Sequence, residues 1–127
     1  MKNKLTCEVN CDKIFLIRKE DVQMEIHYAT EKDKKIFTSE RLIKKYYGKI
    51  ANPLAVRLSE LRVADNLSDI PQTPPPRRHK LGGDYQNCWG LNLSKNYRMV
   101  LQPIGEYDVN DVASIREVKI IRIEDYH

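Results

Sequence analysis

The chain has 127 residues, and its 22 Lys and Arg against 18 Asp and Glu give a formal net charge of +4. This length suits one domain that buries roughly two thirds of its unfolded surface, and the absence of any fixed-period repeat excludes a solenoid. The modest positive charge permits an anionic partner without requiring one. Three cysteines are an odd number and too few for a disulfide-stapled secreted scaffold, so reduced thiols in the cytoplasm are expected.

The N-terminal segment has no clear periodicity. Cys7 and Cys11 stand four apart with no His or further Cys nearby, which is poor zinc spacing, so no metal site is predicted. The apolar run at 14–17 is too short for a signal sequence or a membrane span, and 13–17 fits at most a short strand. The protein is therefore expected to stay in the cytoplasm, with no membrane partner.

The first firm element is a strand at 24–30. Met24, Ile26 and Tyr28 alternate there with polar or small residues, which is the period of a half-buried strand. The charged run at 31–35 is expected to end it.

Two short helices are predicted next. Residues 38–39 offer an N-cap, apolar residues follow at helical spacing, and Gly48 suits the position after the helix end. In the second helix Asn52 is the predicted cap, Pro53 fits the first turn, and leucines recur at helical spacing over 54–61. A tight connection between the two makes a helical hairpin.

The second half changes to strand periodicity. The proline-rich segment 71–76 should run extended over the surface. Alternating residues then predict strands over 89–94 and 97–102, joined by a hairpin turn, and a last strand over 116–125. The order strand, helix, helix and three strands predicts an α+β domain with its helices on one face of a mostly antiparallel sheet.

Cationic and proton-transferring side chains gather in this second half. They are Arg77, Arg78, His79, Lys80, Arg98, Tyr126 and His127. Arg98 is out of phase with the apolar residues of its strand, so it should face away from the core, where few carboxylates are expected to pair with it. Histidine exchanges protons near neutral pH and arginine holds phosphate, so this grouping suits phosphodiester chemistry; the alternative is an ordinary solvated surface.

Four segments together carry a family likeness. They read "MEIHYAT", "KKYYGKIANPLAVRLSELRVADNL", "RRHKLGGDYQNCWGLNLSKNYRMVLQP" and "VKIIRIEDYH". They resemble the RelE/ParE toxin superfamily, specifically its HigB-like plasmid maintenance killer subgroup. The likeness covers 24–127 and leaves 1–23 as an N-terminal extension that could add an edge strand. It implies a two-helix hairpin packed on a small, curved and mostly antiparallel β-sheet.

The resemblance also implies an activity. Such proteins are toxins of bacterial type II toxin-antitoxin systems that enter the 30S A site of the ribosome, contacting mRNA and rRNA, and cut the mRNA. The cut is a metal-independent attack of the ribose 2′-hydroxyl on the phosphodiester, with no cofactor. The partner that neutralises the toxin would be a HigA-like helix-turn-helix antitoxin.

Family roles carry over to four positions. His127 matches the terminal catalytic histidine, Tyr126 the tyrosine before it, Arg98 the transition-state arginine and His79 a second pocket histidine. Which histidine takes the proton stays open. The neighbouring cations expected to bind RNA are Arg77, Arg78 and Lys80.

One departure keeps alternatives open. Gly82 stands where the family often has a lysine that holds substrate phosphate. A weakened relative that mainly binds antitoxin or nucleic acid is therefore the first alternative. A ParE-like gyrase poison is the second, although such relatives lack the terminal pair Tyr126 and His127.

Overall fold

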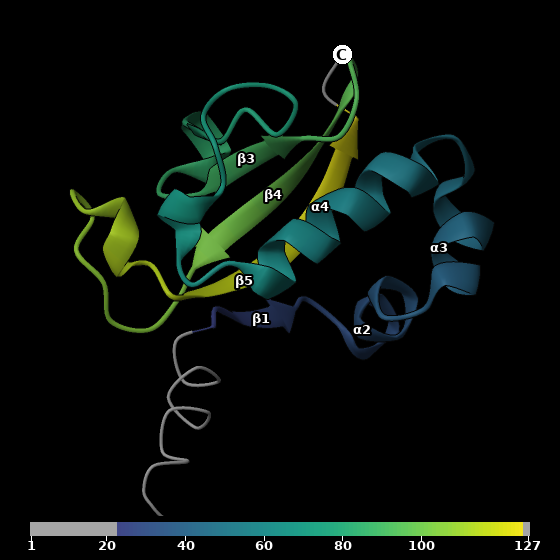
Figure 1. The fold of residues 1–127 in the computed structure, drawn as a ribbon, viewed down its shortest axis with the longest axis horizontal. Coiled ribbons are helices and arrows are strands. Elements are labelled where there is room, and N and C mark those ends of the chain that lie inside the picture. Colours follow the sequence, from purple (N-terminus) through teal and green to yellow (C-terminus); the bar gives the residue numbers. More distant parts are fainter. Residues whose placement is uncertain (1–22, 126–127) are drawn as a thin grey trace, which may run out of the picture.

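The computed structural model describes residues 23–125, so the strand considered at 13–17 and the site residues Tyr126 and His127 lie outside the described part. Five strands form one sheet: β1 (Glu25–Tyr28), β2 (His79–Lys80), β3 (Trp89–Asn92), β4 (Tyr97–Pro103) and β5 (Glu117–Asp125). Their order is β1-β5-β4-β3-β2, with β1 parallel to β5 and the other neighbours antiparallel. Figure 1 shows this sheet with the long helix α4 lying across it.

The helices are α2 (Glu31–Phe37), α3 (Glu40–Tyr47) and α4 (Ala51–Val63), with four short 3-10 turns, η2 (Gly48–Ile50), η3 (Leu67–Asp69), η4 (Gly83–Tyr85) and η5 (Val112–Ser114). The strand ends before the charged run at 31–35, as expected, and this run also forms α2, which the sequence did not predict. Thr30 caps α2 by accepting a hydrogen bond from the Asp33 amide at 3.0 Å, and Ile36 and Phe37 anchor its end in the core. No helix of the described residues is long and apolar enough to span a bilayer.

The helix caps were predicted with mixed success. Ser39 accepts a hydrogen bond from the Leu42 amide at 3.2 Å, which confirms the cap of α3. The cap predicted at Asn52 is wrong, because α4 already begins at Ala51 and Asn52 lies inside its first turn. The turn η2 runs directly into α4, so the helix needs no separate side-chain cap there.

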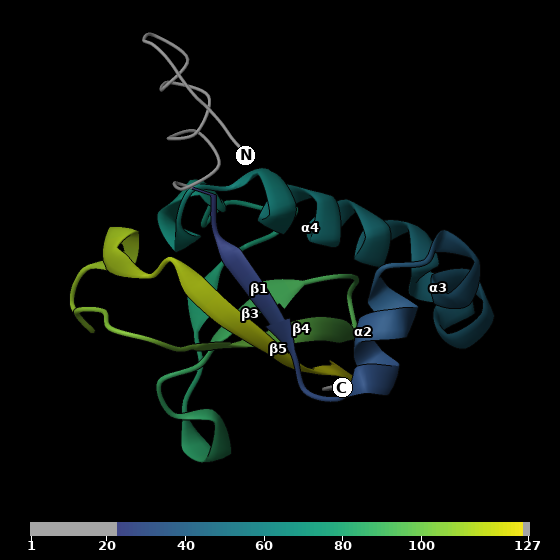
Figure 2. The same cartoon turned by 90° about the horizontal axis from the view of Figure 1, so that it is seen from below.

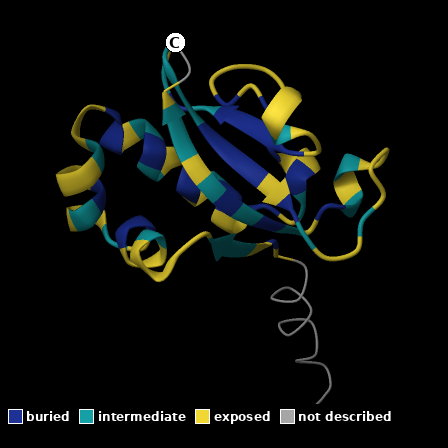
Figure 3. Ribbon diagram, turned by 180° about the vertical axis from the view of Figure 1, so that it is seen from behind, coloured by how far each residue is buried: buried dark blue, intermediate teal, exposed yellow. Residues whose placement is uncertain are grey.

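The core lies between α4 and the sheet. Leu54, Leu58 and Leu61 of α4 are at most 1% exposed, as their helical spacing predicted. They face buried strand residues of one sheet face: Leu91, Met99, Leu101, Val118 and Ile120. Burying each such side chain stabilises the fold by roughly 1.5–3 kcal/mol. Figure 3 shows the central strands largely buried, with the exposed residues concentrated in loops and outer helix faces.

The proline-rich segment 71–76 doubles back instead of running extended. The Arg77 amide donates to the Thr73 carbonyl at 3.1 Å and the Arg78 amide donates to the Pro71 carbonyl at 2.9 Å. These two bonds close a turn that period and composition did not reveal. The segment thereby delivers the chain to β2 at the edge of the sheet.

A bulge in β5 decides which residues face the other side of the sheet. The register between β4 and β5 shifts between Val100 and Leu101, which leaves Ile121 as the extra residue. Beyond a bulge the side-chain alternation is reversed. Ile123 therefore packs against the core, and Glu124 projects from the face opposite α4, which we call the open face.

Candidate active site

An ion pair between the last two long strands marks one end of the open face. Arg98 and Glu124 are direct partners in the β4–β5 register. The Arg98 Nη2 and Nε atoms lie 2.6 and 2.8 Å from Glu124 Oε2, and the two side chains are 18% and 14% exposed. The expectation that Arg98 would meet few carboxylates is therefore wrong, because the bulge in β5 places Glu124 on the same face of the sheet as Arg98.

Tyr85, from the turn η4, contacts this ion pair on the open face of the sheet. The turn η4 lies on the opposite side of the sheet from α4, as the teal-green turn at the bottom of Figure 2 shows. Tyr85 Oη donates to Glu124 Oε1 at 2.7 Å and accepts from Arg122 Nη1 at 3.2 Å. The Arg98 guanidinium lies 5.9 Å from the centre of the Tyr85 ring. One carboxylate thus holds an arginine and a tyrosine together.

These contacts determine the charges of the group. The hydrogen bond from Tyr85, and then that from Arg98, lower the pKa of Glu124, although partial burial opposes them. The same hydrogen bond to Glu124 raises the pKa of Tyr85. At neutral pH Glu124 therefore carries its negative charge and the Tyr85 phenol keeps its proton.

His79 lies on the same face, two strands away. Its register partner is Gly90, and a Cβ built on Gly90 would lie 3.1 Å from His79 Cε1 and 3.2 Å from Nε2, so the imidazole lies over the glycine. His79 Nδ1 is 2.7 Å from the Arg77 carbonyl oxygen. A carbonyl oxygen can only accept, so Nδ1 carries the proton and Nε2 of the neutral ring has a lone pair. Among the described residues, Nε2 has no hydrogen-bond partner.

The three cations expected to bind RNA have different surroundings. Arg78 is buried, its Nε donates to the Ile70 carbonyl at 2.7 Å, and burial lowers its pKa. Arg78 and Lys80 lie 5.2 and 5.9 Å from the centre of the Trp89 ring, on the side of the sheet away from His79. Arg77 is exposed, with a φ of 44°. We therefore leave Arg78, which is buried, and Lys80, which lies on the other side of the sheet from His79, out of the proposed RNA contacts.

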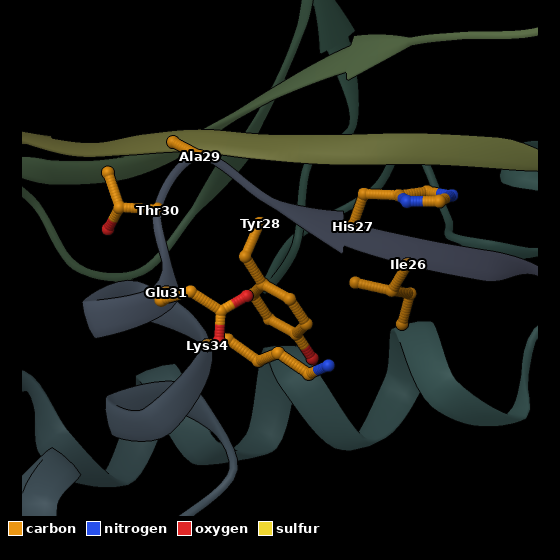
Figure 4. A pocket seen from close by; sticks show the side chains of 7 residues that line it. All are labelled: Ile26, His27, Tyr28, Ala29, Thr30, Glu31 and Lys34. Carbon is orange, nitrogen blue, oxygen red and sulfur yellow. The ribbon is translucent and has the colours of Figure 1, made fainter.

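Some of the predicted site residues lie together on the open face, and others do not. The structure brings Arg98 and His79 to one face, together with Glu124, Tyr85 and Arg122, which sequence reasoning missed. No sequence signal identifies Glu124 and Arg122, because strict alternation places both in the core. Two hollows of about 430 and 450 Å³ lie elsewhere, and the first of them, beside β1, is drawn in Figure 4.

Comparisons with known proteins bear on the fold. The sequence matches no protein-family model and no curated protein. The structure aligns with the YoeB/ParE toxin from Agrobacterium tumefaciens at a TM-score of 0.50, over 82% of this chain and 100% of that chain, with 10% identity. Two structures of the YoeB–YefM complex from Staphylococcus aureus align at a TM-score of 0.46, over 83% of this chain and 98% of the other, with 12% identity.

The first alignment confirms the predicted fold class. The chain has an α+β fold similar to that of a YoeB/ParE toxin, with helices on one face of a mostly antiparallel sheet. The similarity is structural, since only one residue in ten is shared. It does not distinguish a HigB-like subgroup.

Proposed function

We propose that this chain is the toxin of a bacterial toxin-antitoxin pair and that it cleaves mRNA in the ribosomal A site. The observation that supports this most is that an arginine held by an ion pair and a histidine whose Nε2 can accept a proton lie on the same face of the sheet. The similarity to a toxin fold supports the same class of activity. The partners would be an antitoxin, HigA-like in type, and the ribosome with its mRNA and rRNA, all in the cytoplasm.

The proposed reaction needs no metal. His79 Nε2 accepts the proton of the ribose 2′-hydroxyl, and the oxygen attacks the adjacent phosphorus. The bond from phosphorus to the 5′-oxygen breaks, and His127 supplies the proton that this leaving oxygen requires. The products are a 2′,3′-cyclic phosphate and a free 5′-hydroxyl, and Arg98 stabilises the charge that grows on the phosphoryl oxygens.

Glu124 would act on Arg98 as a positioning residue. Its carboxylate fixes the guanidinium against the sheet at 2.6 and 2.8 Å. A substrate phosphate therefore meets an arginine that is already oriented, which reduces the ordering cost of binding. Tyr126 would stack on a base, and Arg77 would contact the RNA backbone.

The same ion pair favours one alternative. Because Glu124 neutralises Arg98, the chain could instead be a weakened relative that mainly binds antitoxin or nucleic acid. The variant Glu124→Gln distinguishes an active nuclease from a weakened relative. Cleavage should fall if Glu124 positions Arg98, and it should rise if Glu124 only competes with the phosphate.

Induced expression without antitoxin tests the proposal in a bacterial host, with growth and RNA 5′ ends as readouts. The parent chain should arrest growth and cut mRNA inside translated codons. His79→Gln and Arg98→Lys should both remove the cuts, because the first lacks the proton acceptor and the second lacks the planar guanidinium. Arg116→Lys, at an exposed position near the start of β5, is the matched control and should cut like the parent.

Three outcomes would count against the proposal. Growth arrest with gyrase-dependent DNA damage and no mRNA cuts would indicate the ParE-like activity. Cuts that the Arg98→Lys protein still makes at the parent's level would contradict the role of Arg98 as the phosphate-stabilising group. A His127→Ala protein that stays fully toxic would remove His127 from the mechanism.

A further inference from the structure

Three metal-ligating side chains meet at the other end of the sheet. β1 and β5 run parallel with Glu25 opposite Glu117, and His27 follows two residues later on the same face. His27 Nε2 lies 2.9 Å from Glu117 Oε2 and 3.6 Å from Glu25 Oε1, and the three ligand atoms are within 4.8 Å of one another. Figure 4 shows His27 on the opposite side of β1 from Ile26 and Tyr28, which point toward α4.

These separations suit a coordination sphere. Zinc binds nitrogen and oxygen at about 2.0–2.2 Å, so neighbouring ligands around one ion are roughly 3–3.5 Å apart. Two of the three separations already lie near that range. Glu25 is 73% exposed at its side chain, so it can adjust to an ion without disturbing the core.

We propose that Glu25, His27 and Glu117 bind a divalent transition-metal ion of the Zn²⁺ type. An imidazole nitrogen with two carboxylate oxygens favours such an ion over Mg²⁺ or Ca²⁺, which take oxygen ligands almost alone. Water would complete the coordination on the solvent side, where all three side chains are partly exposed.

The surroundings of Glu117 support a prepared ligand. Gly105 has a φ of 78°, and a Cβ built on it would lie 2.6 Å from Glu117 Oε1. The missing side chain leaves room for this carboxylate against the backbone, with Oε2 turned toward His27. The sequence alone did not predict this cluster, because its three residues come together only when β1 pairs with β5.

The charges of the two glutamates also support a cation at this position. Glu25 and Glu117 are adjacent like charges on neighbouring strands, an arrangement that destabilises a sheet. In the described part of the chain, the only ion pairs of both carboxylates are to His27. A divalent cation held by all three side chains would neutralise both carboxylates at once.

The ion would have a structural role. Glu117 and Glu124 lie near opposite ends of β5, roughly 23 Å apart at about 3.3 Å per residue, so the cluster is remote from Arg98. It joins the short edge strand β1 to the long strand β5. The inference is independent of the proposed nuclease activity.

Calorimetric titration of the full-length, EDTA-stripped protein with ZnCl₂ tests the site. The parent should bind one ion, and losing a ligand in His27→Gln or Glu117→Gln should weaken binding by about tenfold or more. The matched control is Glu106→Gln, whose carboxylate borders the same hollow as Glu25 and Glu117 without belonging to the cluster, and it should bind like the parent. Zn²⁺ should also raise the unfolding temperature of the parent and the control only.

Two results would overturn the proposal. Equal Zn²⁺ binding by the parent, His27→Gln and Glu117→Gln would assign the ion to other ligands, such as the thiols of Cys7 and Cys11. No binding by the parent at millimolar Zn²⁺ would remove the site. Because Glu25 is largely exposed, Glu25→Gln should fold even if the other variants do not, and unchanged binding in that variant would also contradict a three-ligand site.

Discussion

Replacing Glu124 by Gln should destabilise the fold through the group around Arg98. The exchange keeps the shape of the side chain but removes the charge that accepts from Arg98 Nη2 at 2.6 Å, Arg98 Nε at 2.8 Å and Tyr85 Oη at 2.7 Å. A hydrogen bond to a charged group contributes about 1.5–3 kcal/mol, and an amide N–H would oppose one of the donors. Because the two charged side chains keep 18% and 14% exposure, we expect the lower part of this range, about 2 kcal/mol, to be lost from the free energy of unfolding at pH 7.

The pH dependence follows from the lowered pKa of Glu124. In the unfolded chain a glutamate titrates at about 4.3, so below that value the unfolded state binds a proton that the folded state does not. The stabilisation by Glu124 is complete above the unfolded pKa and is lost as the pH falls through the folded one. The difference between the parent and Glu124→Gln should be constant from about pH 6 to 8 and shrink below about pH 4.

Urea unfolding followed by Trp89 fluorescence measures this difference, since the chain has one tryptophan and it is buried. The exposed Glu106→Gln is the control, and it should change the free energy of unfolding by less than about 0.5 kcal/mol. A Glu124→Gln protein as stable as the parent at pH 7 would refute the reasoning. So would a difference that persists unchanged at about pH 3, because it would then not depend on the charge.

The other predictions concern space and burial. Gly90→Ala should displace the His79 imidazole, whose Cε1 would be 3.1 Å from the new Cβ, and so lower RNA cleavage by about tenfold or more. The control is Gly82→Ala, which has nothing within 4 Å of its new Cβ and should cleave like the parent. Equal cleavage by the two variants would contradict the position of the His79 ring over Gly90. Gly82→Lys should bind a short RNA more tightly in fluorescence anisotropy, because there is open space around this position. The salt dependence of RNA binding should become steeper by about one phosphate contact. An unchanged salt dependence would mean that the new lysine does not reach the phosphates. Leu61→Ala should lower the free energy of unfolding by about 2–5 kcal/mol in urea titrations. Val63 is 72% exposed, so Val63→Ala should change the free energy of unfolding by less than about 0.5 kcal/mol. Equal losses in the two variants would mean that α4 buries another of its faces.

Much of the fold was predictable because burial leaves a period in the sequence. The alternation that predicted strands over 97–102 and 116–125 corresponds to β4 (Tyr97–Pro103) and β5 (Glu117–Asp125). The leucines of α4 recur at helical spacing because one face of that helix packs on the sheet. Helix α2 (Glu31–Phe37) was missed because its first residues are charged and exposed, and only Ile36 and Phe37 at its end reach the core.

The sequence by itself determined that Arg98 lies opposite the core, since β4 keeps a strict alternation. It could not determine what Arg98 meets. Strict alternation from Ile120 would turn Glu124 into the core, whereas the extra residue Ile121 reverses the later side chains and places Glu124 beside Arg98. Only the tertiary structure decided this, because a bulge depends on how β5 pairs with β4 and on burying Ile123 instead of a carboxylate.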